Sequence, residues 1–136
     1  MRLFDTTFIV DLVNSEAGAV RLAKVVDEEA SLASISAVSV HEYLFGVYLK
    51  YQKDDDALKE KLASAQNDLG RFEVIPLTRE VAEVSCNIHA KLANEGKQIG
   101  INDICIAATA LRYDLNLVTR NKTHFGRIPK LRLENY

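Results

Sequence analysis

Three carboxylates in this 136-residue chain stand beside apolar segments that lie far apart in the sequence. Asp5 follows the apolar pair 3–4, and Asp103 opens the apolar run 104–108. Glu42 follows the largely apolar stretch that begins at residue 32. A carboxylate has no packing role at such places, and burying one without a partner is costly. If the three converge, they form an oxygen-rich, negative pocket that suits a hard divalent cation such as Mg²⁺ or Mn²⁺.

Further polar groups stand at the ends of two other apolar segments. The run Thr119-Arg120-Asn121 follows the apolar pair 117–118, and Ser36 ends another apolar segment. The hydroxyl groups of Thr119 and Ser36 are suited to orient a carboxylate or a metal-bound water. Thr119 and Asn121 therefore join the three acids as candidate site residues.

Each acid also has a purely structural interpretation. Asp5 and Asp103 both stand where a helix begins, so either one could be a helix N-cap, and for a single acid that is the commoner role. Glu42 lies one turn inside its helix, where it complements the helix dipole. Three acids at equivalent places in three strand–helix units are harder to explain in this way, which favours a shared site.

The elements that position these residues follow from hydrophobic periodicity and turn signals. Ser15, Thr78 and the pair Asn102-Asp103 are expected to cap helices. Strands are predicted at 2–5, 32–36, 72–77, 116–119 and 130–133, with helices at 6–13, 15–26, 38–50, 53–71, 78–95 and 103–113. Strands that alternate with helices predict an α/β fold, with a mostly parallel central sheet of about five strands between two helical layers. Ligands bind outside the carboxyl ends of such strands.

The composition is that of one folded domain, residues 1–136, with 48% hydrophobic and 26% charged residues. The chain has no apolar run near the roughly 18 residues that a membrane span needs. It also shows no signal-peptide pattern, so a cytoplasmic protein is expected. Cys86 and Cys105 have no partner at metal-ligand spacing, and two buried, reduced thiols are expected.

The net charge of −2 is unevenly distributed. Residues 120–136 hold five basic residues and one acid, a net +4, which leaves −6 on residues 1–119. A basic strip beside an acidic pocket suits a polyanion. The alternative is an edge strand whose Lys and Arg side chains block aggregation, and charge alone favours this alternative.

Other chemistries lack their motifs. The sequence has no G-x-S-x-G, Walker A or G-x-G-x-x-G pattern. His41, His89 and His124 are not at zinc-ligand spacing. A phosphate-accepting receiver domain would need paired acids after the first strand and a lysine after the last, and neither is present.

Four blocks of the sequence together resemble PIN domains, and in particular the VapC toxins of prokaryotic toxin–antitoxin pairs. They are Leu3-Phe4-Asp5-Thr6-Thr7-Phe8-Ile9, Ile35-Ser36-Ala37-Val38-Ser39-Val40-His41-Glu42, Asn102-Asp103-Ile104-Cys105-Ile106-Ala107-Ala108-Thr109-Ala110 and Leu117-Val118-Thr119-Arg120-Asn121-Lys122-Thr123-His124-Phe125. The resemblance spans essentially the whole chain and implies a single PIN domain over residues 1–136, with a three-layer α/β/α sandwich.

The resemblance implies a metal-dependent endoribonuclease that hydrolyses RNA phosphodiester bonds, with tRNA and mRNA as candidate substrates. By position, Asp5, Glu42 and Asp103 match the family's acidic metal ligands for Mg²⁺ or Mn²⁺. Asn121 stands at a fourth position that is Asp in many PIN domains and Asn in a large subset of VapC-like ones. The fourth carboxylate is therefore missing, which weakens the case for a second ion. His124 replaces a further acid often found in this block.

The resemblance also implies partners. VapC toxins are usually dimers held inactive by a VapB-type antitoxin, so a homodimer and a VapB-like antitoxin are expected. An antitoxin helix could lie in a groove that includes Tyr43, Phe45 and Tyr48, although core packing is the commoner role for aromatic residues at this spacing. The missing fourth acid keeps open an alternative function, a catalytically weak PIN-like module that binds RNA or protein.

Overall fold

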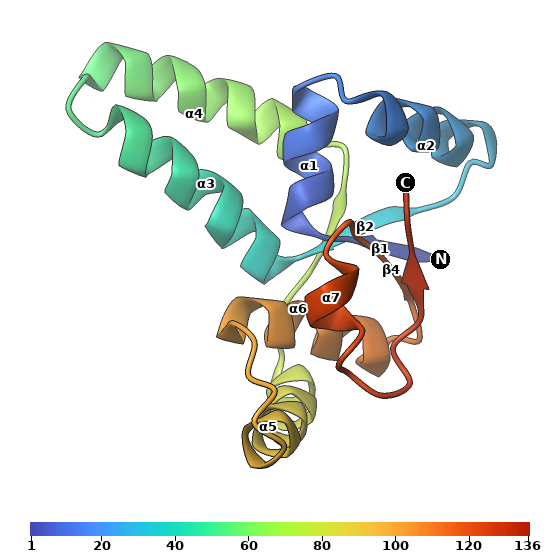
Figure 1. Ribbon diagram of the computed structural model, residues 1–136. Coiled ribbons are helices and arrows are strands. Elements are labelled where there is room, and N and C mark those ends of the chain that lie inside the picture. The colour runs from blue at the N-terminus through green and yellow to red at the C-terminus, as the bar shows by residue number, and fades with distance from the viewer.

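The computed structural model describes residues 1–136 as seven helices around one five-stranded sheet (Figure 1). The strands are β1 (Arg2–Phe4), β2 (Ala33–Ser36), β3 (Glu73–Ile75), β4 (Asn116–Val118) and β5 (Leu133–Glu134). The helices are α1 (Thr6–Val13), α2 (Ala17–Glu28), α3 (Ala37–Tyr51), α4 (Asp55–Leu69), α5 (Arg79–Asn94), α6 (Ile101–Arg112) and α7 (Lys122–Phe125). None of these helices is long and apolar enough to cross a membrane.

All strand pairs are parallel, and the strand order is β3-β2-β1-β4-β5. The predicted α/β fold with a parallel sheet is confirmed. Phe4 of β1 pairs with Ile35 of β2 on one side and with Val118 of β4 on the other. Because the strands are parallel and in this register, Asp5 and Thr119 both follow the same edge of the sheet. The chain adds β2 and β3 on one side of β1 and β4 on the other, so this edge is the topological switch point where α/β folds bind ligands.

Side chains alternate between the two faces of the sheet and build a separate core on each. Leu3 and Leu117 point to one face, where they pack with α5, α6 and the segment that holds Phe125. Phe4 and Val118 point to the other face, where they pack with α1, α2 and α4. Figure 1 shows this division, with α1 to α4 on one side of the strands and α5 to α7 on the other. The two cores fix both walls of the edge at which β1 and β4 end.

Helix starts agree with the sequence in most cases. Thr78 caps α5, and Asp54 caps α4. The expectation that Ser15 caps α2 is wrong: Ser15 has a φ of +58°, and the Glu16 side chain accepts the hydrogen bond from Ala19 N–H instead.

The predicted start of α6 is also wrong, and the difference matters for the site. The helix begins at Ile101 with Gly100 as its N-cap, which has no side chain to cap with. Asp103 therefore lies inside the first turn and is not a cap. The capping interpretation of Asp103 is excluded, while the dipole at the helix N-terminus still favours an acid there.

Two more expectations fail at the surface. The last strand is Leu133–Glu134 and not 130–133, because Lys130 has a left-handed φ of +66° that no strand accommodates. Cys86 is exposed and Cys105 is half-buried, so the expectation of two buried thiols is wrong.

Candidate active site

The predicted site residues meet in one cleft of about 340 Å³ at the carboxyl edge of the sheet. Its lining consists of Asp5, Thr6, Thr7, Val10, Asp11, Glu42, Asp103, Ile106 and Asn121. Thr119 is buried beside it and reaches it through Asp5. The residue that follows β1, residues of α1, α3 and α6 and the segment after β4 thus form a single surface that holds four carboxylates and no Lys or Arg.

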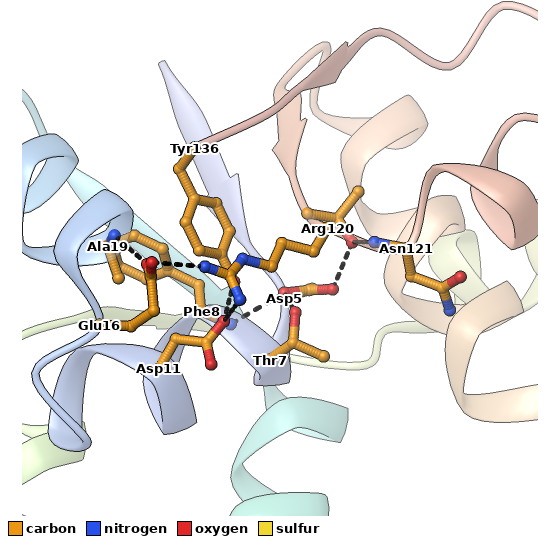
Figure 2. A network of polar contacts seen from close by, with 10 residues as sticks. Asp5, Thr7, Phe8, Asp11, Glu16, Ala19, Arg120, Asn121 and Tyr136 are labelled. Carbon is orange, nitrogen blue, oxygen red and sulfur yellow. Dashed lines mark hydrogen bonds and ion pairs between the residues drawn. The ribbon is translucent and has the colours of Figure 1, made fainter.

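Asp5 is the buried centre of this cleft, with only 3% of its surface exposed. Its Oδ1 accepts hydrogen bonds from the Thr7 hydroxyl at 2.6 Å and from Phe8 N–H at 3.1 Å. Its Oδ2 accepts one from the Thr119 hydroxyl at 2.5 Å. Figure 2 shows Thr7 and Phe8 beside the carboxylate. Asp5 is therefore the N-cap of α1 and, because each carboxylate oxygen has two lone pairs, it also keeps acceptor capacity for a ligand.

Burial raises the pKa of Asp5, and the hydrogen bonds from Thr119, Thr7 and Phe8 oppose that effect. The negative charge of Asp103 raises it further. An ionised Asp5 is thus held by donors but poorly solvated and repelled by a second carboxylate. A cation in the cleft would favour the ionised form.

Glu42 is held from two other elements. Its Oε1 accepts a hydrogen bond from the Thr6 hydroxyl at 2.6 Å, and its Oε2 accepts one from Asn102 Nδ2 at 3.3 Å. Ser36 caps α3 through Val38 N–H, which leaves it without the role in orienting a carboxylate that the sequence allowed. Glu42 is therefore an oriented carboxylate on the wall of the cleft.

Asp103 faces the cleft from α6, and its Oδ2 lies 3.2 Å from His124 Nδ1. Burial raises the pKa of the Asp103 carboxyl, the contact with His124 lowers it, and the charge of Glu42 raises it again. Asp5, Asp103 and Glu42 therefore form a chain of mutually repelling groups.

Asn121 closes the cleft on the side of β4. Its backbone N–H donates to Thr119 Oγ1 at 2.9 Å, and its side chain caps the short helix α7 by accepting from His124 N–H. Asn121 Nδ2 also lies 3.0 Å from His124 Nδ1. Asn121 brings no charge, so it can orient a ligand or a water but cannot offset a second cation.

Four lining or supporting residues were missed in the sequence. Thr6 and Thr7 were taken only as a helix start, and Asn102 only as a cap, although each adjoins one of the acids. Asp11 lies one turn after Thr7 on α1, and helical spacing alone places the two on one side of that helix. Hydroxyl and amide side chains next to a candidate ligand were the available signal.

The side chains of the cleft offer the oxygen donors that a hard cation prefers, but they do not form a complete ligand shell. No group of three or more His, Cys, Asp or Glu side chains is close enough together to hold one ion directly. The available donors are oxygen atoms, the cleft lining has no positive side chain, and Asp5 and Asp103 repel each other. Mg²⁺ typically takes one or two carboxylates and keeps several waters, which matches a site of this kind.

Two of the five basic residues that follow β4 are held in ion pairs. Arg120 pairs with Asp11 and Glu16, and Arg132 pairs with Asp114. A larger cleft of about 570 Å³ between α5 and residues 127–130 contains none of the predicted site residues. The chemistry therefore centres on the smaller cleft.

The family model described as "PIN domain" matches residues 2–131 of this chain. The chain is 31% identical over 110 residues to ribonuclease VapC2 of Haemophilus influenzae, a match that covers 81% of this chain and 80% of that protein. It is 30% identical over 102 residues to the tRNA(fMet)-specific endonuclease VapC of Salmonella typhimurium, covering 75% and 74% of the two chains.

The fold has a close counterpart among solved structures. The structure of DNA-bound VapBC from Salmonella typhimurium superposes with a TM-score of 0.83 and 28% sequence identity. The match covers 99% of this chain and 98% of that one. The similarity therefore extends over the whole sheet and both helical layers.

Proposed function

This chain belongs to the PIN domain family, and from that premise we propose that it is a metal-dependent endoribonuclease, the toxin of a type II toxin–antitoxin pair. Its relatives named ribonuclease and tRNA(fMet)-specific endonuclease support RNA as the substrate. The observation that carries the proposal is the cleft at the switch point of the sheet. There Asp5, Glu42 and Asp103, which come from three separate strand–helix units, face one space with no basic side chain in its lining.

Asp5 and Asp103 are the proposed direct ligands of Mg²⁺ or Mn²⁺, with Glu42 acting through a water or as the general base. When bound, such an ion supplies charge stabilisation for a phosphate oxygen and lowers the pKa of a water. Thr7 and Thr119 hold the two oxygens of Asp5 in fixed positions, so the Asp5 carboxylate does not have to reorient to bind an ion.

Glu42 is the proposed acceptor of a proton from a water in the cleft. Thr6 and Asn102 each donate to one of its oxygens, which sets the orientation of the carboxylate. Asn121 and Thr119 would orient water or ligands without adding charge. The residues thus separate into acids that bind or accept a proton and neutral groups that orient them.

The direct test is RNA cleavage by the purified full chain with Mg²⁺, with Mn²⁺ and with EDTA. Cleavage that requires the metal and disappears in Asp5→Asn is the expected result. A wild-type protein that leaves RNA intact with both metals would contradict the proposal. In that case, a shift of the same RNA in a gel-shift assay would support the alternative, a module that binds RNA without cutting it. The neutral Asn121 and the incomplete ligand shell favour this alternative.

A VapB-like antitoxin is the proposed protein partner, and a homodimer is the proposed assembly. The similarity to a VapBC structure supports the partner. Phe45 and Tyr48 are exposed on α3 and could receive an apolar helix, with an arginine of the partner entering the acidic cleft. Tyr43 does not belong to that surface, because its hydroxyl donates to Asp68 and its ring packs on the core.

Co-expression with any small protein encoded beside this chain tests the partner, and light scattering tests the dimer. Co-purification with loss of RNA cleavage is expected. A protein that elutes alone and stays active would argue against an antitoxin of this kind.

A further inference from the structure

Arg120 lies outside the cleft and makes a three-way contact with α1, with the segment before α2 and with the end of the chain. Its Nη2 lies 2.7 Å from Glu16 Oε1, and its Nη1 lies 3.4 Å from Asp11 Oδ2. The guanidinium carbon lies 5.0 Å from the centre of the Tyr136 ring. Figure 2 shows the guanidinium beside the Asp11 and Glu16 carboxylates, with the Tyr136 ring next to it. A planar cation of this kind matches carboxylates and aromatic faces together.

The partners of Arg120 are themselves fixed. Glu16 Oε2 accepts from Ala19 N–H at 2.8 Å, so one oxygen caps α2 while the other holds Arg120. The Tyr136 hydroxyl donates to Asp11 Oδ2 at 2.7 Å, and its ring packs edge-on against Phe8 at 5.0 Å. Burial raises the pKa of Tyr136 well above its usual range, so the hydroxyl keeps its proton as a donor.

The backbone at Tyr136 is close-packed as well. A Cβ atom on Gly18 would come within 2.9 Å of the Tyr136 carbonyl carbon, so only glycine allows this approach. Arg120 therefore binds to a rigid frame made of α1, α2 and the end of the chain.

Arg120 stands between the two residues of the β4–α7 connection that serve the cleft. Thr119, before it, donates to Asp5 Oδ2, and Asn121, after it, donates its N–H to Thr119 Oγ1. On the other side, Thr7 of α1 donates to Asp5 Oδ1, one helical turn before Asp11. The two oxygens of Asp5 are thus held by two segments, and Arg120 joins those segments.

We propose that Arg120, with Tyr136 as its support, is a positioning residue that fixes Asp5 for metal binding by tying the β4–α7 connection to α1. The effect on metal binding and cleavage rests on the proposed function, whereas the link between the β4–α7 connection and α1 rests on these contacts alone. Side chains that orient metal ligands commonly contribute 10- to 100-fold to metal affinity. Displacing a reacting group by about 1 Å can cost 100-fold in rate.

A purely stabilising ion pair gives a different expectation. The Arg120 side chain is 43% exposed, and ion pairs at such exposure contribute little to stability. Arg132 offers a matched control, because it is 55% exposed and pairs with Asp114 at 2.9 Å, away from the cleft. If Arg120 only stabilised the fold, losing it would resemble losing Arg132.

The test compares Arg120→Met, Arg120→Lys and Arg132→Met in the full chain. We expect Arg120→Met to weaken Mn²⁺ binding by about tenfold in calorimetry and to lower kcat by about 10- to 100-fold with little change in KM. Arg120→Lys should recover part of the Mn²⁺ affinity and part of kcat, because lysine keeps the positive charge but cannot contact both carboxylates as the guanidinium does. Arg132→Met should match wild type in both, and the melting temperatures of the two Met variants should lie close together.

Hydrogen exchange without metal or RNA gives an independent readout. The Phe8 and Asn121 amides donate to Asp5 and Thr119, so Arg120→Met should reduce their protection at least about fivefold more than Arg132→Met does. Equal protection, affinity and kcat in the two Met variants would overturn the inference while leaving an active wild type as evidence for the proposed function. A wild type that neither binds Mn²⁺ nor cuts RNA, with protection lost only in Arg120→Met, would refute the function and retain the positioning.

Discussion

The Thr119 hydroxyl donates to Asp5 Oδ2 at 2.5 Å, which links the ends of two adjacent strands across 114 positions of sequence. The register of β1 and β4 brings the two together, because Phe4 pairs with Val118. The hydroxyl also accepts from Asn121 N–H. One threonine therefore connects the central carboxylate to the segment that carries Asn121.

Replacing Thr119 by Val should destabilise the protein by about 1–3 kcal/mol, because it leaves a buried acceptor without its donor. RNA cleavage should fall in parallel as Asp5 loses its orientation. Urea unfolding measures the first effect and a cleavage assay the second. Thr119→Ser keeps the hydroxyl and serves as the control. Equal stability of Thr119→Val and wild type would mean that the hydrogen bond contributes nothing.

Asp5→Asn should reduce RNA cleavage at least about a hundredfold while the chain stays folded. Asn removes the charge that a divalent cation needs. It still caps α1, because Asn is as good an N-cap as Asp. Circular dichroism checks the fold, and Asp55→Asn, at an exposed position in the first turn of α4, is the control. Retained cleavage in a preparation free of other nucleases would refute the proposed role of Asp5.

Divalent metal should stabilise the protein against heat. A ligand that binds only the folded state at 100 times its Kd adds about 2.7 kcal/mol, which raises Tm by several degrees for a chain of this size. Thermal melts in Mn²⁺ and in EDTA measure the difference. Asp103→Asn should lose most of the shift. Identical midpoints in the two conditions would count strongly against a metal site.

The ends of β1 and β4 were predictable from sequence to within one residue, and with them the edge where the site lies. Apolar runs set the strands, and the alternation of strands and helices set the parallel topology. Asp5 and Asn121 line the cleft for that reason, whereas Glu42 and Asp103 reach it from α3 and α6. Glu42 lies inside its helix as predicted, but α6 begins two residues before the predicted start at Asp103.

Contacts between distant segments were not predictable. Gly100 caps α6 without a side chain, so the sequence pointed to Asn102-Asp103 as the cap, whereas Asn102 instead donates to Glu42 across 60 positions. The pairing of Arg120 with Asp11 and Glu16 is equally non-local. The composition of residues 120–136 left open whether the basic residues face a polyanion or protect an edge strand, because it gives no information about which acids lie opposite.

The pH dependence of the metal-free protein should show the raised pKa of Asp103. A carboxyl whose pKa is raised in the folded state stabilises fully below its ordinary value of 3.8, and this contribution disappears as pH rises through the folded pKa. Glu16 and Glu80, whose pKa values are lowered by hydrogen bonds, act in the opposite direction. The difference in unfolding free energy between wild type and an Asp103 variant isolates the contribution of this carboxyl.

Asp103→Asn should therefore gain stability relative to wild type as pH rises from 4 to 7 in EDTA. Urea unfolding across that range measures the difference, and Asp55→Asn should show no such trend. A difference that shrinks with rising pH would have the wrong sign for a carboxyl destabilised by burial and by Glu42.

Asn121→Asp should place a carboxylate at the position that is Asp in many PIN domains and tighten Mn²⁺ binding, by about tenfold if the added charge contributes about 1.4 kcal/mol. Asp preserves the cap on α7 that Asn121 provides, so the local structure should persist. Without metal, the added charge should lower Tm, because the new carboxylate repels those already lining the cleft. Calorimetric titration and melts in EDTA measure the two effects, with Asn121→Ser as the neutral control. An Asp variant that binds Mn²⁺ no more tightly and melts at the same temperature would show that position 121 lies outside the electrostatic reach of the site.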